Sequence, residues 1–300
     1  MASSKLPIYS ALVANLAIAV TKFIAAAITG SSAMISEGIH SVVDTSNEVL
    51  LLLGISKSKK LPDDNRPFGY GKELYFWSFI VSILIFGVGG GISFYEGVMD
   101  LQHPNPIENP FWNYIVLVVA LIFDGSSFII ALKAFNKKRA DTPFWKAVKK
   151  SKDPTSFVVL FEDAADVLGL VVAFAGIVMG QWLHEPIWDG IASILIGLIL
   201  TGVSIVLARE SRSLLMGETA SPVILNEVKE MVMNDPAVLN LRKSMSMYMA
   251  PEEMLLVLET VFRDELTTHE LNAAINRIKT VINKRFPIIK QIYIEPESEK

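Results

Sequence analysis

Six apolar runs dominate the first two thirds of the chain, and they limit its fold more than any other feature. The runs lie at residues 8–28, 32–55, 74–99, 111–135, 156–182 and 187–208. A helix of about twenty apolar residues is long enough to cross the hydrocarbon core of a bilayer. Only 19% of the residues are charged, and the mean hydropathy is +0.42. The sequence therefore predicts a multi-pass α-helical membrane domain, with six transmembrane helices, over residues 1–210.

Residues 211–300 have a different character, because they are rich in charge and contain no apolar run of that length. Their patterns predict a helix at 222–235, strands at 238–248 and 254–263, a helix at 267–285 and a strand at 288–294. Thr267 or Thr268 is the expected N-cap of the second helix. In the second strand, the residues that point to one face and those that point to the other are both mainly apolar. This pattern predicts that both faces of the strand are covered. This αββαβ order predicts a separate α+β domain.

Basic residues are distributed unevenly between the loops. The loops at 56–73 and 136–153 are rich in Lys and Arg, whereas those near 29–31, 100–110 and 183–186 contain neither. Because cytoplasmic loops are enriched in Lys and Arg, both termini and both basic loops are expected in the cytoplasm. The first apolar run has no small-residue cleavage pattern, and no targeting peptide is evident. The simplest expected location is therefore the plasma (inner) membrane of a prokaryote.

Ionisable side chains interrupt two of the apolar runs. Glu37, His40, Asp44, Asn47 and Glu48 lie in the second run, and Glu162, Asp163 and Asp166 lie in the fifth. Ionisable groups are costly inside a bilayer, so they mark ion pathways, metal sites or proton relays. At 100° per residue, the polar residues of the second run share an arc of roughly 100° on one helix.

The spacing of these groups suits a divalent cation. His40 and Asp44 are one helical turn apart, as are Glu162 and Asp166, so each pair can reach one point beside its helix. Imidazole and carboxylate groups are ligands for divalent transition metals. The predicted metal ligands are therefore His40, Asp44, Glu162 and Asp166. Whether further polar groups join them is left open; the candidates are Asp163, Asp124, Glu37 and Asn47.

Three carboxylates around one cavity would repel one another, so we expect protons on some of them until a cation arrives. Metal ligands must be deprotonated to bind, and an arriving metal ion would therefore expel those protons. The pattern predicts proton-coupled exchange of a divalent metal cation.

Other classes of protein fit these residues less well. The chain has no cysteine, which excludes thiolate metal sites. No nucleotide-binding loop follows a predicted strand, so an ATP-driven pump is not supported. A membrane metalloenzyme is disfavoured because no separate nucleophile or base accompanies the acids. A non-transporting, metal-sensing membrane scaffold is disfavoured because all four ligand positions are filled. We expect no prosthetic cofactor and no nucleic-acid partner.

Three segments carry a resemblance to a known family. They are Gly30–Asp44 (GSSAMISEGIHSVVD), Pro62–Lys72 (PDDNRPFGYGK) and Phe161–Val167 (FEDAADV). On these segments the chain resembles the cation diffusion facilitator family of metal/proton antiporters, and most of all its branch with a mitochondrial zinc transporter. The resemblance implies a six-span homodimer that exchanges cytoplasmic metal for protons by alternating access. It also implies a tetrahedral site between the second and fifth spans and a ferredoxin-like cytoplasmic dimerisation domain.

The chain departs from that family's pattern at several positions. Glu162 stands where many members have histidine, so Mn²⁺, Fe²⁺ or Co²⁺ joins Zn²⁺ as a possible cargo. Arg66 and Tyr70 stand where many members have histidines that form a second site, which is therefore not expected here. His269 is the one histidine of the C-terminal domain, so metal sensing by that domain is not expected either.

Overall fold

The computed structural model describes residues 6–104, 110–139 and 141–297. The chain divides into two compact units. The first, which we call the helical unit, comprises Met1–Ser56 and Phe76–Ser211, and the second, the C-terminal unit, comprises Lys57–Tyr75 and Arg212–Lys300. The basic loop that precedes the third apolar run thus belongs to the same unit as the C-terminal region.

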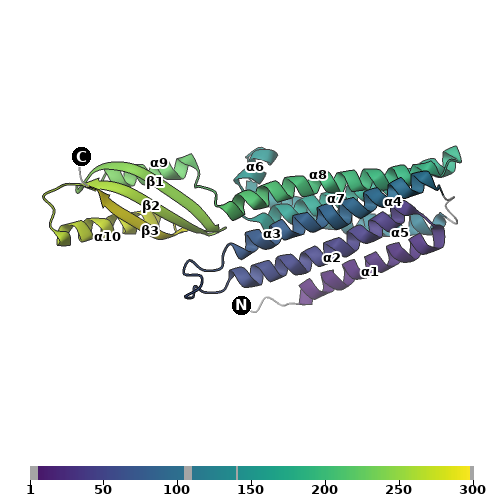
Figure 1. The fold of residues 1–300 in the computed structure, drawn as a ribbon, viewed down its shortest axis with the longest axis horizontal. Helices are drawn as coiled ribbons and strands as arrows, with labels where there is room; N and C mark the ends of the chain where they lie inside the picture. The colour runs from purple at the N-terminus through teal and green to yellow at the C-terminus, as the bar shows by residue number, and fades with distance from the viewer. Residues whose placement is uncertain (1–5, 105–109, 140, 298–300) are drawn as a thin grey trace. The chain divides into compact units, whose positions relative to one another are not determined.

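Helices cover all six apolar runs (Figure 1). They are α1 (Leu6–Thr29), α2 (Ser32–Ser58), the continuous segment α3 (Glu73–Leu84), η1 (Ile85–Gly90) and α4 (Gly91–Gln102), then α5 (Phe111–Arg139), α7 (Pro154–Leu183) and α8 (Ile187–Met216). Among the described residues, three segments are long and apolar enough to cross a membrane: Glu73–Gln102, Phe111–Lys137 and Ile187–Met216. Helices α2 and α7 contain the acidic residues noted above. The structure therefore shows a helical, membrane-type domain. A short helix, α6 (Phe144–Lys150), lies in the second basic loop, where the sequence analysis predicts no element.

Small residues bring α8 close to the segment of η1 and α4. A Cβ added to Gly90 would lie 2.7 Å from Thr201 Oγ1, and one added to Gly97 would lie 2.7 Å from the Gly190 carbonyl oxygen. Such small residues allow transmembrane helices to pack closely, because no large side chain separates the two backbones.

Helix α8 also holds the start of α2. Asp189 accepts hydrogen bonds from Ser31 Oγ at 2.8 Å, Ser32 Oγ at 3.1 Å and the Ala33 amide at 3.3 Å. An aspartate from another helix thus satisfies amide and hydroxyl groups at an N-terminus, where a helix leaves its first N–H groups unpaired. One turn further along, Ser36 hydrogen-bonds Ser193. These contacts fix the position of α2, which carries the polar residues singled out by the sequence.

The C-terminal unit contains α9 (Pro222–Met233), β1 (Val238–Ala250), β2 (Glu253–Phe262), α10 (Thr268–Arg285) and β3 (Ile289–Glu297), in the predicted αββαβ order (Figure 1). Strand β2 is central, antiparallel to β1 and parallel to β3. Thr267 is the N-cap of α10, and it forms a capping box with Glu270. The sequence prediction of a cap at Thr267 or Thr268 is confirmed at Thr267.

One face of β2 packs on the helices. Leu256 and Leu258 of β2 are fully buried in the same core as Ala274, Ile278 and Ile282 of α10. The intervening side chains of β2, from Leu255 to Glu259, are only half-buried. Both helices share one core with the same face of β2, and cover over the opposite, half-buried face stays a prediction.

Candidate metal site

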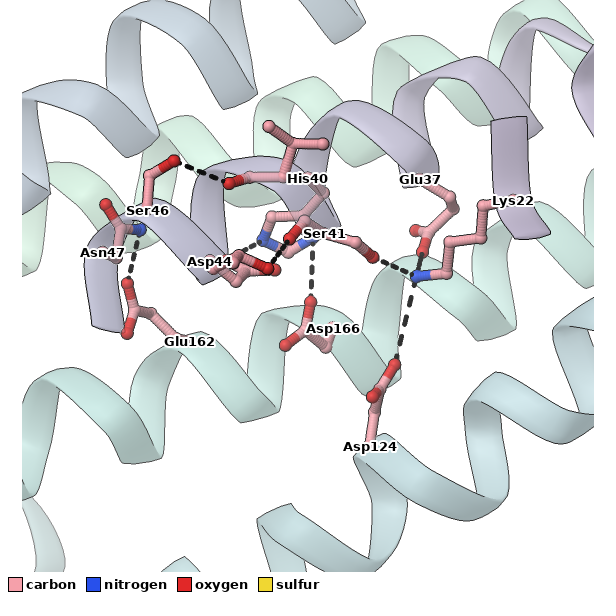
Figure 2. A network of polar contacts seen from close by, with 12 residues as sticks. Lys22, Glu37, His40, Ser41, Asp44, Ser46, Asn47, Asp124, Glu162 and Asp166 are labelled. Carbon is pink, nitrogen blue, oxygen red and sulfur yellow. Dashed lines mark hydrogen bonds and ion pairs between the residues drawn. The ribbon is translucent and has the colours of Figure 1, made fainter. Parts of the chain in front are cut away.

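Three of the four predicted ligands meet between α2 and α7 (Figure 2). His40 Nε2 lies 3.4 Å from Asp44 Oδ1 on the same helix, and His40 Nδ1 lies 3.1 Å from Asp166 Oδ1 on α7. One ligand atom from each residue lies within 4.8 Å of the others, which is a suitable arrangement for a metal ion. The imidazole of His40 is 1% exposed, whereas the side chains of Asp44 and Asp166 keep 15% and 12% of their surface exposed.

The facing atoms of this cluster lack hydrogen bonds. Both ring nitrogens of His40, Asp44 Oδ1 and Asp166 Oδ1 are buried, and none has a hydrogen-bond partner in the described part of the chain. The His–Asp contacts are close enough for ion pairs but do not have hydrogen-bond geometry. Buried polar atoms are nearly always satisfied in native structures, because leaving them bare costs free energy. A divalent cation among them would satisfy these atoms at once, so the donor set fits a metal ion.

Glu162, the fourth predicted ligand, does not join this cluster. Its Oε1 accepts a hydrogen bond of 2.8 Å from Asn47 Nδ2 (Figure 2). The side chain of Glu162, which extends from α7, is thus held by a polar residue of α2. Glu162 lines the same cavity as Asp44 and Asp166, one turn before Asp166. Its place as a ligand stays a prediction, and the structure pairs it with Asn47 by a hydrogen bond.

A cavity of about 220 Å³ adjoins the cluster. Besides the ligands, its lining is mainly polar or acidic: Asn15, Ser41, Glu48, Asp124, Ser127 and Asp163. Within it, Asp163 accepts a 2.9 Å hydrogen bond from Ser127, and Glu48 accepts a 3.0 Å bond from Asn15. A cation that passed through this cavity would meet carboxylate and hydroxyl oxygens on its way to His40.

Lys22 is a charged group near the site that the sequence analysis does not single out. Its side chain is 0% exposed on α1, and its Nζ lies 3.0 Å from Glu37 Oε2, 2.8 Å from Ser41 Oγ and 4.0 Å from Asp124 Oδ2 (Figure 2). A lone lysine inside an apolar run is the signal that could have found it, because such a charge is costly in a membrane. Glu37 and Asp124, both left open as ligands, are thus partners of a lysine.

Comparison with known proteins finds matches over most of the chain. The family model of the cation efflux transmembrane domain matches residues 8–216. The human mitochondrial proton-coupled zinc antiporter SLC30A9 is 38% identical over 219 residues, which cover 72% of this chain and 39% of the relative. Metal tolerance protein C4 of Arabidopsis thaliana is 31% identical over 240 residues, 79% of this chain and 52% of the relative.

A bacterial relative matches over more of its length. The manganese efflux system protein MneP of Bacillus subtilis is 23% identical over 290 residues, which cover 95% of this chain and 92% of MneP. In contrast, the chain spans only 39% of the human antiporter's length and 52% of the plant protein's.

Proposed function

This chain belongs to the cation efflux family, and from that membership we propose that it exports divalent transition-metal cations, with Zn²⁺ as the cargo, in exchange for protons. The observation that carries the proposal is the convergence of His40, Asp44 and Asp166, whose buried atoms face one another without hydrogen bonds. Metal ligands must be deprotonated to bind. Each ion that binds therefore displaces the protons that these groups held, which couples metal transport to protons.

Zinc is favoured over manganese as the cargo. One imidazole nitrogen and carboxylate oxygens suit tetrahedral Zn²⁺. The human zinc antiporter is 38% identical to this chain, whereas the bacterial manganese exporter is 23% identical. In the proposed loaded state, Glu162 leaves Asn47 and becomes the fourth ligand. Export of manganese is the second candidate, because Glu162 adds an oxygen where the family resemblance leads one to expect histidine nitrogen.

The proposed topology has six spans with both termini in the cytoplasm. The cavity is lined by the first half of α7, whose start follows one basic loop, and by the middle of α2, whose C-terminal end precedes the other basic loop. The positive-inside rule places those ends in the cytoplasm. At the other end of α2, Asp189 and Ser193 of α8 hold the helix by hydrogen bonds. We infer that cytoplasmic metal enters through the cavity and that alternating access opens the opposite end.

For the C-terminal unit we propose a ferredoxin-like dimerisation domain, so that the transporter is a homodimer. The αββαβ order and the half-buried outer face of β2 support this proposal. The human relative is named as mitochondrial, which gives no support to the prokaryotic plasma membrane expected from the sequence. The proposal therefore covers orientation in the membrane and not the compartment.

Transport by purified protein in liposomes under an imposed pH gradient tests the function. We expect Zn²⁺ uptake that depends on the gradient, and we expect Asp44→Ala and Asp166→Ala to abolish it. Glu230→Ala, an exposed acid on α9, is the matched control and should transport like the parent. Uptake by Asp44→Ala and Asp166→Ala at the parent's rate would show that the proposed site is wrong.

A further inference from the structure

Lys22 places a positive charge next to the proposed metal ligands. A buried lysine is tolerated only when its charge is paired and its N–H groups are satisfied. Lys22 meets this condition with Glu37 at 3.0 Å, Ser41 at 2.8 Å and Asp124 at 4.0 Å. Two of these partners, Glu37 and Ser41, flank His40 on α2. The lysine is therefore bound to the same helix surface that supplies the histidine ligand.

Its two acidic partners are groups that could themselves bind a cation. Glu37 precedes His40 by three residues, which places both on the same face of α2. Asp124 lines the cavity together with Asp44 and Asp166. Glu37 Oε1 is buried and makes no hydrogen bond within the described chain, so Lys22 and the packing around it hold this carboxylate. Without the ammonium group, neither carboxylate would be held by an ion pair to Lys22.

We propose that Lys22 is a positioning residue for metal selectivity, which keeps Glu37 and Asp124 away from the ion. The ion then meets only His40, Asp44, Asp166 and Glu162. Zn²⁺ favours four ligands in a tetrahedron, whereas Mn²⁺ favours more oxygen ligands in an octahedron. Releasing two more carboxylates therefore favours Mn²⁺. This inference rests on the proposed export function and names a determinant of its specificity.

The test compares Zn²⁺ and Mn²⁺ uptake by the full-length protein in liposomes, with KM and kcat measured for each metal. Lys22→Met removes the ammonium group and keeps a long apolar stem. We expect its preference for Zn²⁺ over Mn²⁺ in kcat/KM to fall roughly tenfold, which corresponds to about 1.4 kcal/mol. Most of the change should be a lower KM for Mn²⁺. Lys22→Arg, which keeps the charge, should retain most of the preference.

Removing one released carboxylate should reverse the effect. Lys22→Met combined with Glu37→Gln should regain part of the zinc preference, because one of the two added oxygen ligands is lost. Lys229→Met, at an exposed lysine of α9, controls for the loss of a positive charge and should behave like the parent. An unchanged preference in Lys22→Met would overturn the inference.

A second comparison keeps the inference testable if Lys22→Met does not fold. Replacing both members of a buried ion pair is tolerated better than removing one. The Lys22→Met/Glu37→Gln variant should favour Mn²⁺ more than the same variant with Asp124→Asn added, and equal preferences would overturn the inference. Failure of the proposed function looks different, because the parent itself would then show no metal uptake that depends on the pH gradient. Loss of uptake in Asp44→Ala, with unchanged preference in Lys22→Met, would refute only the role of Lys22.

Discussion

His40 Nδ1 on α2 lies 3.1 Å from Asp166 Oδ1 on α7, and this contact joins the two helices at the proposed metal site. The other ring nitrogen of His40 lies 3.4 Å from Asp44 Oδ1. One imidazole is thus placed between carboxylates from two helices, with no hydrogen bond to satisfy either nitrogen in the described chain. In the proposed alternating-access cycle, a relative movement of α2 and α7 would change the distance between the ligands and therefore the affinity for the metal.

Glu162→His should increase the preference for zinc over manganese. The change replaces a carboxylate oxygen by an imidazole nitrogen, a ligand that suits Zn²⁺ better than Mn²⁺. Competition between the two metals in the liposome uptake assay measures the preference. A preference equal to that of the parent would show that Glu162 does not contact the ion.

Asn47→Ala should change how the fourth ligand reaches the metal. Asn47 Nδ2 donates the 2.8 Å hydrogen bond that holds Glu162 away from the cluster. Without that bond Glu162 is freer to move to the ion, so we expect tighter Zn²⁺ binding to the purified protein by calorimetry. In Asn47→Ala/Glu162→Gln the gain should disappear. Weaker binding by Asn47→Ala would instead indicate that Asn47 itself helps to hold the metal.

Gly169→Ala should destabilise the helical unit. A Cβ at this position of α7 would overlap Glu37 Oε1, which Lys22 and the surrounding helices hold in place. Overpacking of this kind costs about 1–3 kcal/mol, so the melting temperature in detergent should fall. Gly125→Ala is the matched control, because a Cβ there has no atom within 4 Å in its surroundings. Equal melting temperatures for the two variants would contradict the close contact of Glu37 with α7.

Thr267→Ala should loosen the first turn of α10. Thr267 accepts a hydrogen bond from the Glu270 amide, and Glu270 accepts one from the Thr267 amide. Loss of such a cap costs about 1 kcal/mol, so hydrogen exchange should become faster in peptides from the start of α10. Thr280→Ala, in the interior of the same helix, should leave that exchange unchanged. If the start of α10 exchanged hydrogen as slowly in Thr267→Ala as in the parent, the capping box would contribute nothing to the stability of this turn.

The pair of Asp235 and Arg277 should make the stability of the C-terminal unit depend on pH. Burial acts to raise the pKa of Asp235, but the hydrogen bonds and charge of Arg277, together with a hydrogen bond from the Ala237 amide, outweigh it and leave this pKa below the ordinary 3.8. A lowered folded-state pKa stabilises the fold above the unfolded-state pKa of about 3.9, and the contribution is lost as the pH falls through the folded value. The extra hydrogen-exchange protection of the parent over Asp235→Asn should be constant near pH 7 and shrink below about pH 5. A difference that grows on acidification would contradict this sign.

Much of the architecture could be predicted because its signals are local. The one-turn spacing of His40 and Asp44 places them on one helix face whatever α2 packs against, and in the structure their ligand atoms lie within 4.8 Å of one on Asp166. The cap at Thr267 and the antiparallel pairing of β1 with β2 also depend on residues close in sequence. The face of β2 that packs in the core was harder to predict, since its apolar residues lie at consecutive positions. Only the packing of α9 and α10 determines which face is buried.

What sequence alone could not supply is the pairing between distant helices. The role of Lys22 depends on its contacts with Glu37 and Asp124. Nothing in the sequence around Lys22 indicates which face of α1 packs toward α2. The same holds for Asn47, whose contact with Glu162 moves a predicted ligand out of the cluster. Short α6 was missed because Phe144–Lys150 is too short and too basic to show a clear apolar period.

X-ray absorption at the zinc edge of the zinc-loaded, full-length protein tests the central claim most directly. We predict four ligands at about 2.0–2.2 Å, all nitrogen or oxygen, with the scattering pattern of a single imidazole. His40→Ala should remove that imidazole signal. A zinc spectrum with several imidazoles, or one that His40→Ala leaves unchanged, would show that the ion binds elsewhere and not between α2 and α7.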